Sequence, residues 1–152
     1  MSSKETSSFS EAERAAMQQR AEELRSMKGV KGSAKRQREY DACLTAIAEL
    51  DGTDRLVAER FHVIVSEEAP HLDPKTWYGF PSYALDGDVI TFLQPASKFD
   101  TRYATIGFNE RALLDDGEMW ATSFAVVDVT SEVEERLRML VRRAAPSPEG
   151  TE

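Results

Sequence analysis

The stretch KTWYGFPSYALDGDVITF, residues 75–92, indicates how this chain folds. It is rich in aromatic and β-branched residues, which are enriched in strands. Asp86-Gly87 is a dipeptide that favours a tight two-residue turn between antiparallel strands. We therefore predict a β-hairpin whose strands include residues 83–85 and 89–93.

The first part of this stretch contains Gly79 and Pro81. Proline lacks the N–H group that a central strand donates, and glycine in a strand pattern often marks a bulge. We therefore expect a bulge or kink at Gly79. We also expect this part of the chain to lie at a sheet edge or at the rim of a pocket.

Further strands and helices are expected on both sides of the hairpin. Residues 102–108 and 120–129 have strand-like patterns, and a short helix is expected between them at 110–116. Ser10 and Glu13 form a capping-box pattern at the start of a first helix. Apolar residues at helical spacing predict the remaining helices at about residues 40–50, from 53 to just before Pro70, and from Ser131 onward.

The order of these elements predicts the fold class. Helices, then antiparallel strands, then a closing helix are typical of an α+β fold, here a two-layer domain with a sheet of about four to five strands packed against helices. Such a sheet leaves one face for water, a partner or a ligand. We expect one domain at 9–145, with a peripheral helix at 9–30, a basic connector at 31–38, and disordered ends at 1–8 and 146–152.

Composition and charge narrow the class of protein. The chain has 27 acidic and 19 basic residues, a net charge of −8, so nucleic-acid binding is not expected. The single cysteine, Cys43, and the absence of a charged-then-apolar leader favour a cytoplasmic location, and no apolar run is long enough to span a membrane. The basic residues within 25–38 are expected to be solvated or to make a weak anion contact.

Most aromatic residues lie in one part of the chain, from Trp77 to Phe124. If the strands alternate, one set of rings fills the core and the other lines the open face, where a ligand could stack. Cations near the strand ends could anchor a small anionic ligand. The candidate ligand-binding residues are Lys75, Trp77, Tyr78, Phe80, Tyr83, Lys98, Arg102 and Trp120. The alternative is that most of these rings are simply core.

Metal-binding and catalytic motifs are weak in the sequence. His62 and His71 fit no common metal-ligand spacing and are expected at the surface. Asp115, Asp116 and Glu118 form a dense group of carboxylates, which either suits a hard cation or is exposed charge. No serine, cysteine or histidine lies in a recognisable nucleophile motif, so we expect a protein without enzymatic activity.

Three segments resemble the YdhG-like family of small bacterial proteins. They are PKTWYGFPSYALDGDVITF (74–92), SKFDTRYATIGF (97–108) and LLDDGEMWATSFAV (113–126), and with the flanking helical segments the resemblance covers residues 10–145. It implies an α+β fold with an antiparallel sheet and extra N-terminal helices. Some members are named iron chaperones by likeness to frataxin, which delivers iron to iron–sulfur cluster assembly through exposed carboxylates.

The sequence leaves two functions open. The first is a non-enzymatic iron chaperone that binds iron weakly and transiently through Asp115, Asp116 and Glu118 and meets iron–sulfur assembly proteins, as the resemblance implies. The second is a small-ligand-binding module with an aromatic sheet face as its site. In that case Trp77, Tyr78, Phe80 and Tyr83 are the walls, and Lys75 or Arg102 is the anchor.

Overall fold

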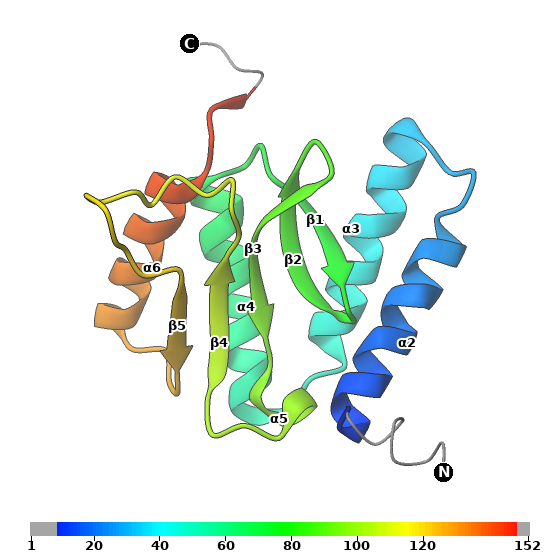
Figure 1. The fold of residues 1–152 in the computed structure, drawn as a ribbon, viewed down its shortest axis with the longest axis horizontal. Coiled ribbons are helices and arrows are strands. Elements are labelled where there is room, and N and C mark those ends of the chain that lie inside the picture. The colour runs from blue at the N-terminus through cyan, green and yellow to red at the C-terminus, as the bar shows by residue number, and fades with distance from the viewer. Residues whose placement is uncertain (1–8, 149–152) are drawn as a thin grey trace.

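The structure, a computed structural model, describes residues 9–148 (Figure 1). Its helices are α2 (Glu11–Ser26), α3 (Gly32–Ala48), α4 (Gly52–Glu68), α5 (Ala96–Phe99) and α6 (Ser131–Ala144), and its strands are β1 (Asp73–Trp77), β2 (Phe80–Leu85), β3 (Asp88–Gln94), β4 (Ala104–Phe108) and β5 (Ser123–Val126). The predicted α+β class is confirmed. The segment 1–8 and the last four residues of the tail, both predicted to be disordered, lie outside the described residues.

The five strands form one antiparallel sheet in chain order. Tyr78-Gly79 joins β1 to β2, and Asp86-Gly87 joins β2 to β3. All four residues have positive φ, at 56° and 84° in the first turn and 53° and 86° in the second. These are the type I′ turns whose twist matches that of paired strands. The predicted Asp86-Gly87 hairpin is confirmed, whereas Gly79 belongs to a second tight turn and not to a bulge.

Pro81 lies in β2, an inner strand, so of the two predicted positions the sheet edge does not apply to it, whereas the neighbouring residues Tyr78 and Phe80 do line a pocket. Pairing between β2 and β3 begins only at Ser82, so Pro81 is paired with Thr76 of β1 and with no residue of β3. The missing N–H therefore lies outside the β2–β3 ladder and removes no bond from it. The register shift that a bulge produces occurs further along β2, between residues 83 and 84.

Helices α3, α4 and α6 cover one face of the sheet, behind it in Figure 1. The core lies between these helices and the sheet, and its large side chains include Phe61, Ile64, Tyr83, Ile90 and Ile106. No helix of the described residues covers the middle of the opposite face, and α2 lies along its β1 edge (Figure 1). We call this second face the open face.

Helix α2 is peripheral, as predicted. The predicted capping box starts it, because Ser10 Oγ accepts a hydrogen bond from the Glu13 N–H (3.0 Å) and Glu13 Oε1 accepts one from the Ser10 N–H (2.9 Å). Ala16 is the one residue that α2 buries. Apolar packing therefore contributes little to holding this helix on the domain.

Three boundaries differ from the predicted ones. Of the predicted basic connector at 31–38, residues 32–38 are the first two turns of α3, because their Ala, Lys, Arg and Gln are strong helix formers. Residues 110–116, predicted as a helix, form a turn at 110–111 followed by irregular chain, and the Leu113 N–H donates to the Ala144 carbonyl instead (2.8 Å). Strand β5 is shorter than the predicted strand at 120–129.

Candidate functional site

Five aromatic rings form a cluster on the open face. Trp77 and Phe80 are paired across β1 and β2, and Phe92 shares their face because strand residues alternate. The Trp77 ring centroid lies 6.0 Å from that of Phe80 and 5.4 Å from that of Phe92. Tyr78 lies 5.2 Å from Trp77, and Phe99 of α5 lies 6.1 Å from Phe80. These tilted and edge-on arrangements are the favourable ones for aromatic pairs. We call the five rings the aromatic cluster.

Gly107 of β4 provides space for one of these rings. It is directly opposite Phe92, and a Cβ atom at position 107 would lie 2.8 and 2.9 Å from two ring carbons of Phe92. The ring therefore lies over the bare backbone of β4. A glycine inside a strand, which normally weakens it, here allows the close approach of a cross-strand aromatic ring.

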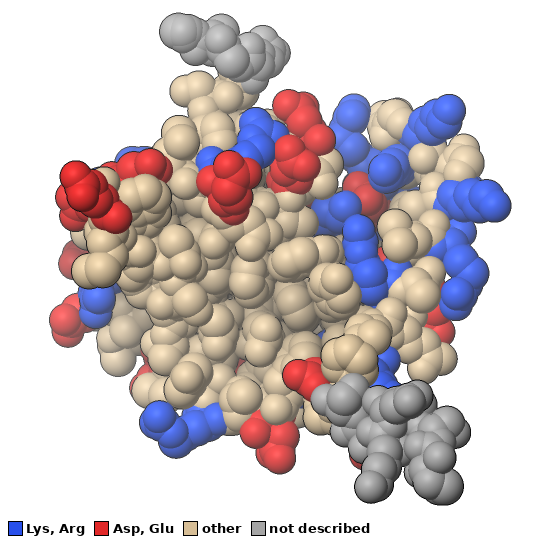
Figure 2. All heavy atoms as spheres, in the orientation of Figure 1, with Lys and Arg blue, Asp and Glu red and all other residues tan. Residues whose placement is uncertain are grey.

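A hollow of about 360 Å³ lies between the aromatic cluster and α2. The cluster and Gln94 line it on the sheet side, and Phe9, Glu13, Ala16 and Met17 line it on the helix side. Phe9 and Met17 are each almost half exposed, so they do not fill it. Figure 2 shows that the middle of the open face carries no charged side chains. The volume is at the lower end of the range for small-molecule sites. We call this space the aromatic hollow.

The Tyr78-Gly79 turn at the rim of this hollow contacts a carboxylate from α2. Glu23 Oε1 accepts a hydrogen bond from the Tyr78 N–H (3.3 Å), and Oε2 accepts one from the Gly79 N–H (2.8 Å). Arg20 Nη1 lies 3.3 Å from Oε1, and the Glu23 side chain is only 16% exposed. Two backbone donors and a guanidinium thus surround one carboxylate. We call the two donors the turn amides.

Lys98 of α5 adds a second cation beside the turn amides. Its Nζ donates a hydrogen bond to Gln19 of α2. A Cβ atom at Gly79 would overlap Gln19 and lie 2.9 Å from Lys98 Nζ, so both side chains pack on this glycine. Partial burial lowers the pKa of Lys98, while the negative charges of Glu23 and Glu49 oppose this shift. Lys98 was predicted from the sequence, and the structure places it at the rim of the site.

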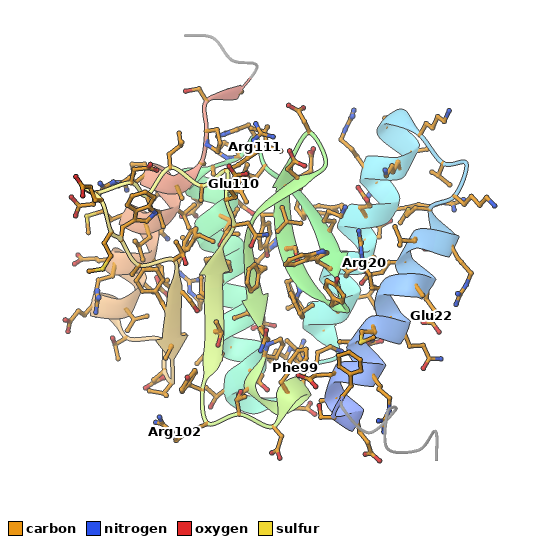
Figure 3. The ribbon with its side chains drawn as sticks, viewed as in Figure 1. Arg20, Glu22, Phe99, Arg102, Glu110 and Arg111 are labelled. Carbon is orange, nitrogen blue, oxygen red and sulfur yellow. The ribbon has the colours of Figure 1, made fainter. Side chains whose placement is uncertain are left out.

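A second, more polar hollow of about 310 Å³ lies on the other side of Trp77. Lys75, a predicted anchor, lines it together with Arg20 and Arg111. Lys75 Nζ is 3.5 Å from a Glu39 carboxylate oxygen. Figure 3 shows Arg20 projecting from α2 towards this part of the sheet, whereas Glu22 projects away from it. Lys75 is therefore adjacent to the aromatic cluster but already paired with an acid.

Tyr83, predicted as a pocket wall, lies on the opposite face in the core. It is 1% exposed, and its hydroxyl is 3.0 Å from His62 Nδ1. Burial raises the pKa of the adjacent Cys43 thiol to about 11, although hydrogen bonds with Tyr83 and the backbone act to lower it. The thiol is fully buried, as expected for an inert cysteine. His62 is half-buried, not a surface residue, because it packs against this core tyrosine.

Two other predicted ligand residues lie away from the aromatic hollow. The Arg102 guanidinium lies 5.2 Å from the centre of the neighbouring Tyr103 ring, and Figure 3 shows it projecting away from Phe99. Trp120 lies in the loop between β4 and β5, is 38% exposed, and lines a different hollow beside Phe108. Neither residue lines the aromatic hollow. Their sequence proximity to the strands did not determine which end of the sheet they occupy.

The predicted metal ligands Asp115, Asp116 and Glu118 are all exposed in the loop between β4 and β5. Among residues 9–148, no group of three or more histidine, cysteine or acidic side chains converges in a way that could hold a metal ion. The assignment of these three carboxylates to iron remains a prediction from the sequence.

The basic residues at the end of α2, in the segment that follows it and in the first turns of α3 form an exposed surface. Figure 2 shows Lys and Arg side chains gathered over this end of the helix pair. The residues predicted to be solvated there, Arg25, Lys28, Lys31, Lys35, Arg36 and Arg38, are all exposed. None of them lines the aromatic hollow.

The site also contains residues that sequence analysis missed. Phe92 lies in a predicted strand whose side chains alternate between the two faces of the sheet, so it could have been assigned to the open face. Phe99 follows the strand on a short helix, where no periodicity reveals its direction. Glu23 gave no signal, because its contact with the turn joins segments 55 residues apart in the sequence, and Arg20 takes part only through its contact with Glu23.

Comparisons of the chain with known protein families, with characterised proteins and with solved structures find no match. The resemblance to the YdhG-like family therefore remains a hypothesis based on the three quoted segments. Within the described part of the chain, no helix has the length and apolar character needed to cross a membrane.

Proposed function

We propose that this protein is a binding module for a small aromatic ligand and that the ligand occupies the aromatic hollow. The observation that carries the proposal is a wall of five rings beside a helix that buries a single residue. Four of the rings, Trp77, Tyr78, Phe92 and Phe99, are only half-buried. Apolar surface left in contact with water is unfavourable, and a bound ring would cover it.

The geometry favours a ligand with one or two rings. A space of about 360 Å³ cannot enclose a large cofactor. The walls are edges and faces of aromatic side chains, which bind another ring at centroid distances similar to those within the cluster. Gln94 and Glu13 at the border offer hydrogen-bonding groups at the margin of an otherwise apolar site.

A neutral aromatic probe tests this proposal. The variant Trp120→Phe leaves Trp77 as the only indole, because the chain has two tryptophans. We expect 3-phenylpropanamide to change the emission of Trp77 saturably, with a dissociation constant in about the millimolar range or tighter, as typical efficiencies per ligand atom imply.

Two matched phenylalanine changes locate the binding. Phe99→Leu removes one wall of the hollow, and Phe124→Leu removes a ring that packs against Phe108 elsewhere. We expect the first change to weaken probe binding about three- to tenfold, the value of one aromatic pair, and the second to leave it within about twofold. Absence of saturable binding, or equal effects of both changes, would show that the hollow is not the site.

Iron binding is the competing function that the YdhG-like resemblance implies. It predicts that ferrous iron binds the metal-free protein in calorimetry and that replacing Asp115, Asp116 and Glu118 by Asn or Gln removes this binding. The aromatic-ligand proposal predicts that the same triple variant binds 3-phenylpropanamide normally, because these residues do not line the aromatic hollow.

A further inference from the structure

We infer that the turn amides of Tyr78 and Gly79 are a binding site for the carboxylate of an aromatic acid, and that Glu23 occupies this site in the structure as an internal competitor. The inference rests on the proposed function and adds the class of ligand and the means by which α2 controls access. Three observations support it: the chemistry around Glu23, the position of the turn, and the weak packing of α2.

The surroundings of Glu23 are those of a carboxylate-binding site. The turn amides donate to separate oxygens at 3.3 and 2.8 Å, which is a bidentate arrangement. Arg20 lies 3.3 Å from one oxygen, and Lys98 supplies a further nearby positive charge. Hydrogen bonds to an ionised acceptor are stronger than neutral ones, and successive backbone N–H groups in a turn form anion-binding sites.

The position of the turn connects this carboxylate site to the aromatic hollow. Tyr78 contributes both its backbone N–H to the carboxylate and its ring to the wall of the hollow. The ring of Phe99 also lines the hollow, and the preceding residue is Lys98. An acid whose ring lies in the hollow can therefore direct its carboxylate towards the turn amides over a short aliphatic link. A ligand that is both aromatic and anionic uses both sites.

The weak packing of α2 makes Glu23 a displaceable occupant. The helix buries only Ala16, and its other contacts with the domain include the Glu23 hydrogen bonds and the Gln19–Lys98 bond. The segment 27–31 connects it to α3 and contains Gly29 at a φ of 80°. A ligand carboxylate that replaces the Glu23 carboxylate accepts the same two hydrogen bonds from the turn amides. The observed affinity of the ligand is then reduced by the fraction of molecules in which Glu23 holds the site.

The test compares two probes of one shape, 3-phenylpropionate and 3-phenylpropanamide. Their ratio of dissociation constants isolates the carboxylate contribution, because both carry the same ring. It is measured in the Trp120→Phe protein and after adding Glu23→Gln, which removes the competing charge. Glu22→Gln is the matched control, since Glu22 is exposed on the far side of the same helix (Figure 3). We expect Glu23→Gln to shift the ratio about tenfold in favour of the carboxylate and Glu22→Gln to leave it unchanged.

The outcomes separate this inference from the proposed function. Suppose that 3-phenylpropanamide binds all variants, and that the ratio of the two dissociation constants is the same in the Trp120→Phe protein with and without Glu23→Gln. The inference is then wrong, and the aromatic hollow remains a binding site. If neither probe binds any of the proteins, both the proposed function and this inference are wrong. If Glu23→Gln loses amide binding because α2 no longer forms the hollow, Lys98→Gln decides instead. Lys98→Gln should weaken binding of 3-phenylpropionate severalfold relative to 3-phenylpropanamide, and an unchanged ratio of their dissociation constants overturns the inference.

A direct measurement uses the amide signals of Tyr78 and Gly79 in nuclear magnetic resonance spectra. In Glu23→Gln, we expect 3-phenylpropionate to shift both signals strongly, because its carboxylate accepts their hydrogen bonds. The amide probe, which occupies the hollow without the charge, should shift them much less. Equal shifts with both probes would contradict a carboxylate site at the turn.

Discussion

Replacing Tyr78 by Asn tests whether the Tyr78 ring contributes to ligand binding more than to the stability of the fold. Tyr78 has a φ of 56°, a left-handed conformation that non-glycine residues adopt at a cost. Asn-Gly is the preferred sequence for a type I′ turn, which is the turn that Tyr78-Gly79 forms. A bulky residue held in this conformation at a binding-site rim is the pattern expected of local strain at a functional position.

The change in stability follows from two opposing contributions. Placing an L-residue in the left-handed region costs about 1–2 kcal/mol, most of which Asn avoids. Losing the Tyr78 ring removes its contact with Trp77 at 5.2 Å and a looser one with Phe80 at 6.5 Å. Aromatic pairs are worth about 0.5–1.5 kcal/mol. We therefore expect Tyr78→Asn to stay within about 1 kcal/mol of the wild-type free energy of unfolding.

Urea unfolding followed by circular dichroism measures this quantity, and Asp86→Asn is the control. Asp86 has a φ of 53° in the second type I′ turn and has no ring to lose, so this variant should be as stable as wild type or slightly more stable. In parallel, Tyr78→Asn should weaken 3-phenylpropanamide binding. A loss of more than about 2 kcal/mol in Tyr78→Asn would refute the reasoning, because it would show that the Tyr78 ring is part of the structural core.

Three further predictions concern the fold that supports the site. Burial lowers the pKa of His62 below its ordinary value of 6.5, so the unfolded chain binds more protons below that pH. The free energy of unfolding should then fall as pH drops through about 6.5, and less so in His62→Gln, as urea unfolding at several pH values would reveal. Gly107→Ala should destabilise the protein by about 1–3 kcal/mol in the same assay, because the added methyl group displaces the Phe92 ring. Asp54 accepts hydrogen bonds from the Ala96 and Ser97 N–H groups, both at 2.9 Å, so Asp54→Ala should lower the melting temperature, whereas a comparable change at a residue without such bonds should not.

Sequence analysis found one of the two tight turns and missed the other for a physical reason. Asp-Gly is a common type I′ pair, so the hairpin at Asp86-Gly87 could be predicted. Tyr78-Gly79 has the same geometry, but a tyrosine rarely adopts a positive φ, so local preference indicated a kink. The turn forms because pairing of β1 with β2 and the Glu23 hydrogen bonds outweigh this preference.

The same limit explains which parts of the site could be predicted. Trp77, Tyr78 and Phe80 belong to one local run of aromatic residues, so the sequence indicated them as a group. The Tyr78-Gly79 turn, and not alternation along one strand, places Trp77 and Phe80 on the same face. Tyr83 was misplaced because it was grouped with Phe80 as an aromatic residue, although alternation along β2 puts the two side chains on opposite faces of the sheet. The Glu23 contact depends on where α2 packs, which no local pattern records.

Helix α2 and the three helices on the other face of the sheet are held by different forces, and this difference bears on how a ligand enters. Helices α3, α4 and α6 bury residues such as Cys43, Phe61 and Val141, so opening them would expose the core. Helix α2 buries only Ala16 and is fixed largely by polar contacts at one turn. Segments with few buried apolar contacts open at a small fraction of the global unfolding free energy. Because the aromatic cluster lies on the side of the sheet that α2 borders, movement of α2 alone would expose more of the five rings, four of which are already only half-buried, while the core stays folded. A site built in this way needs no preformed channel, since the exchange of one carboxylate for another at Tyr78 and Gly79 is enough to admit an aromatic acid.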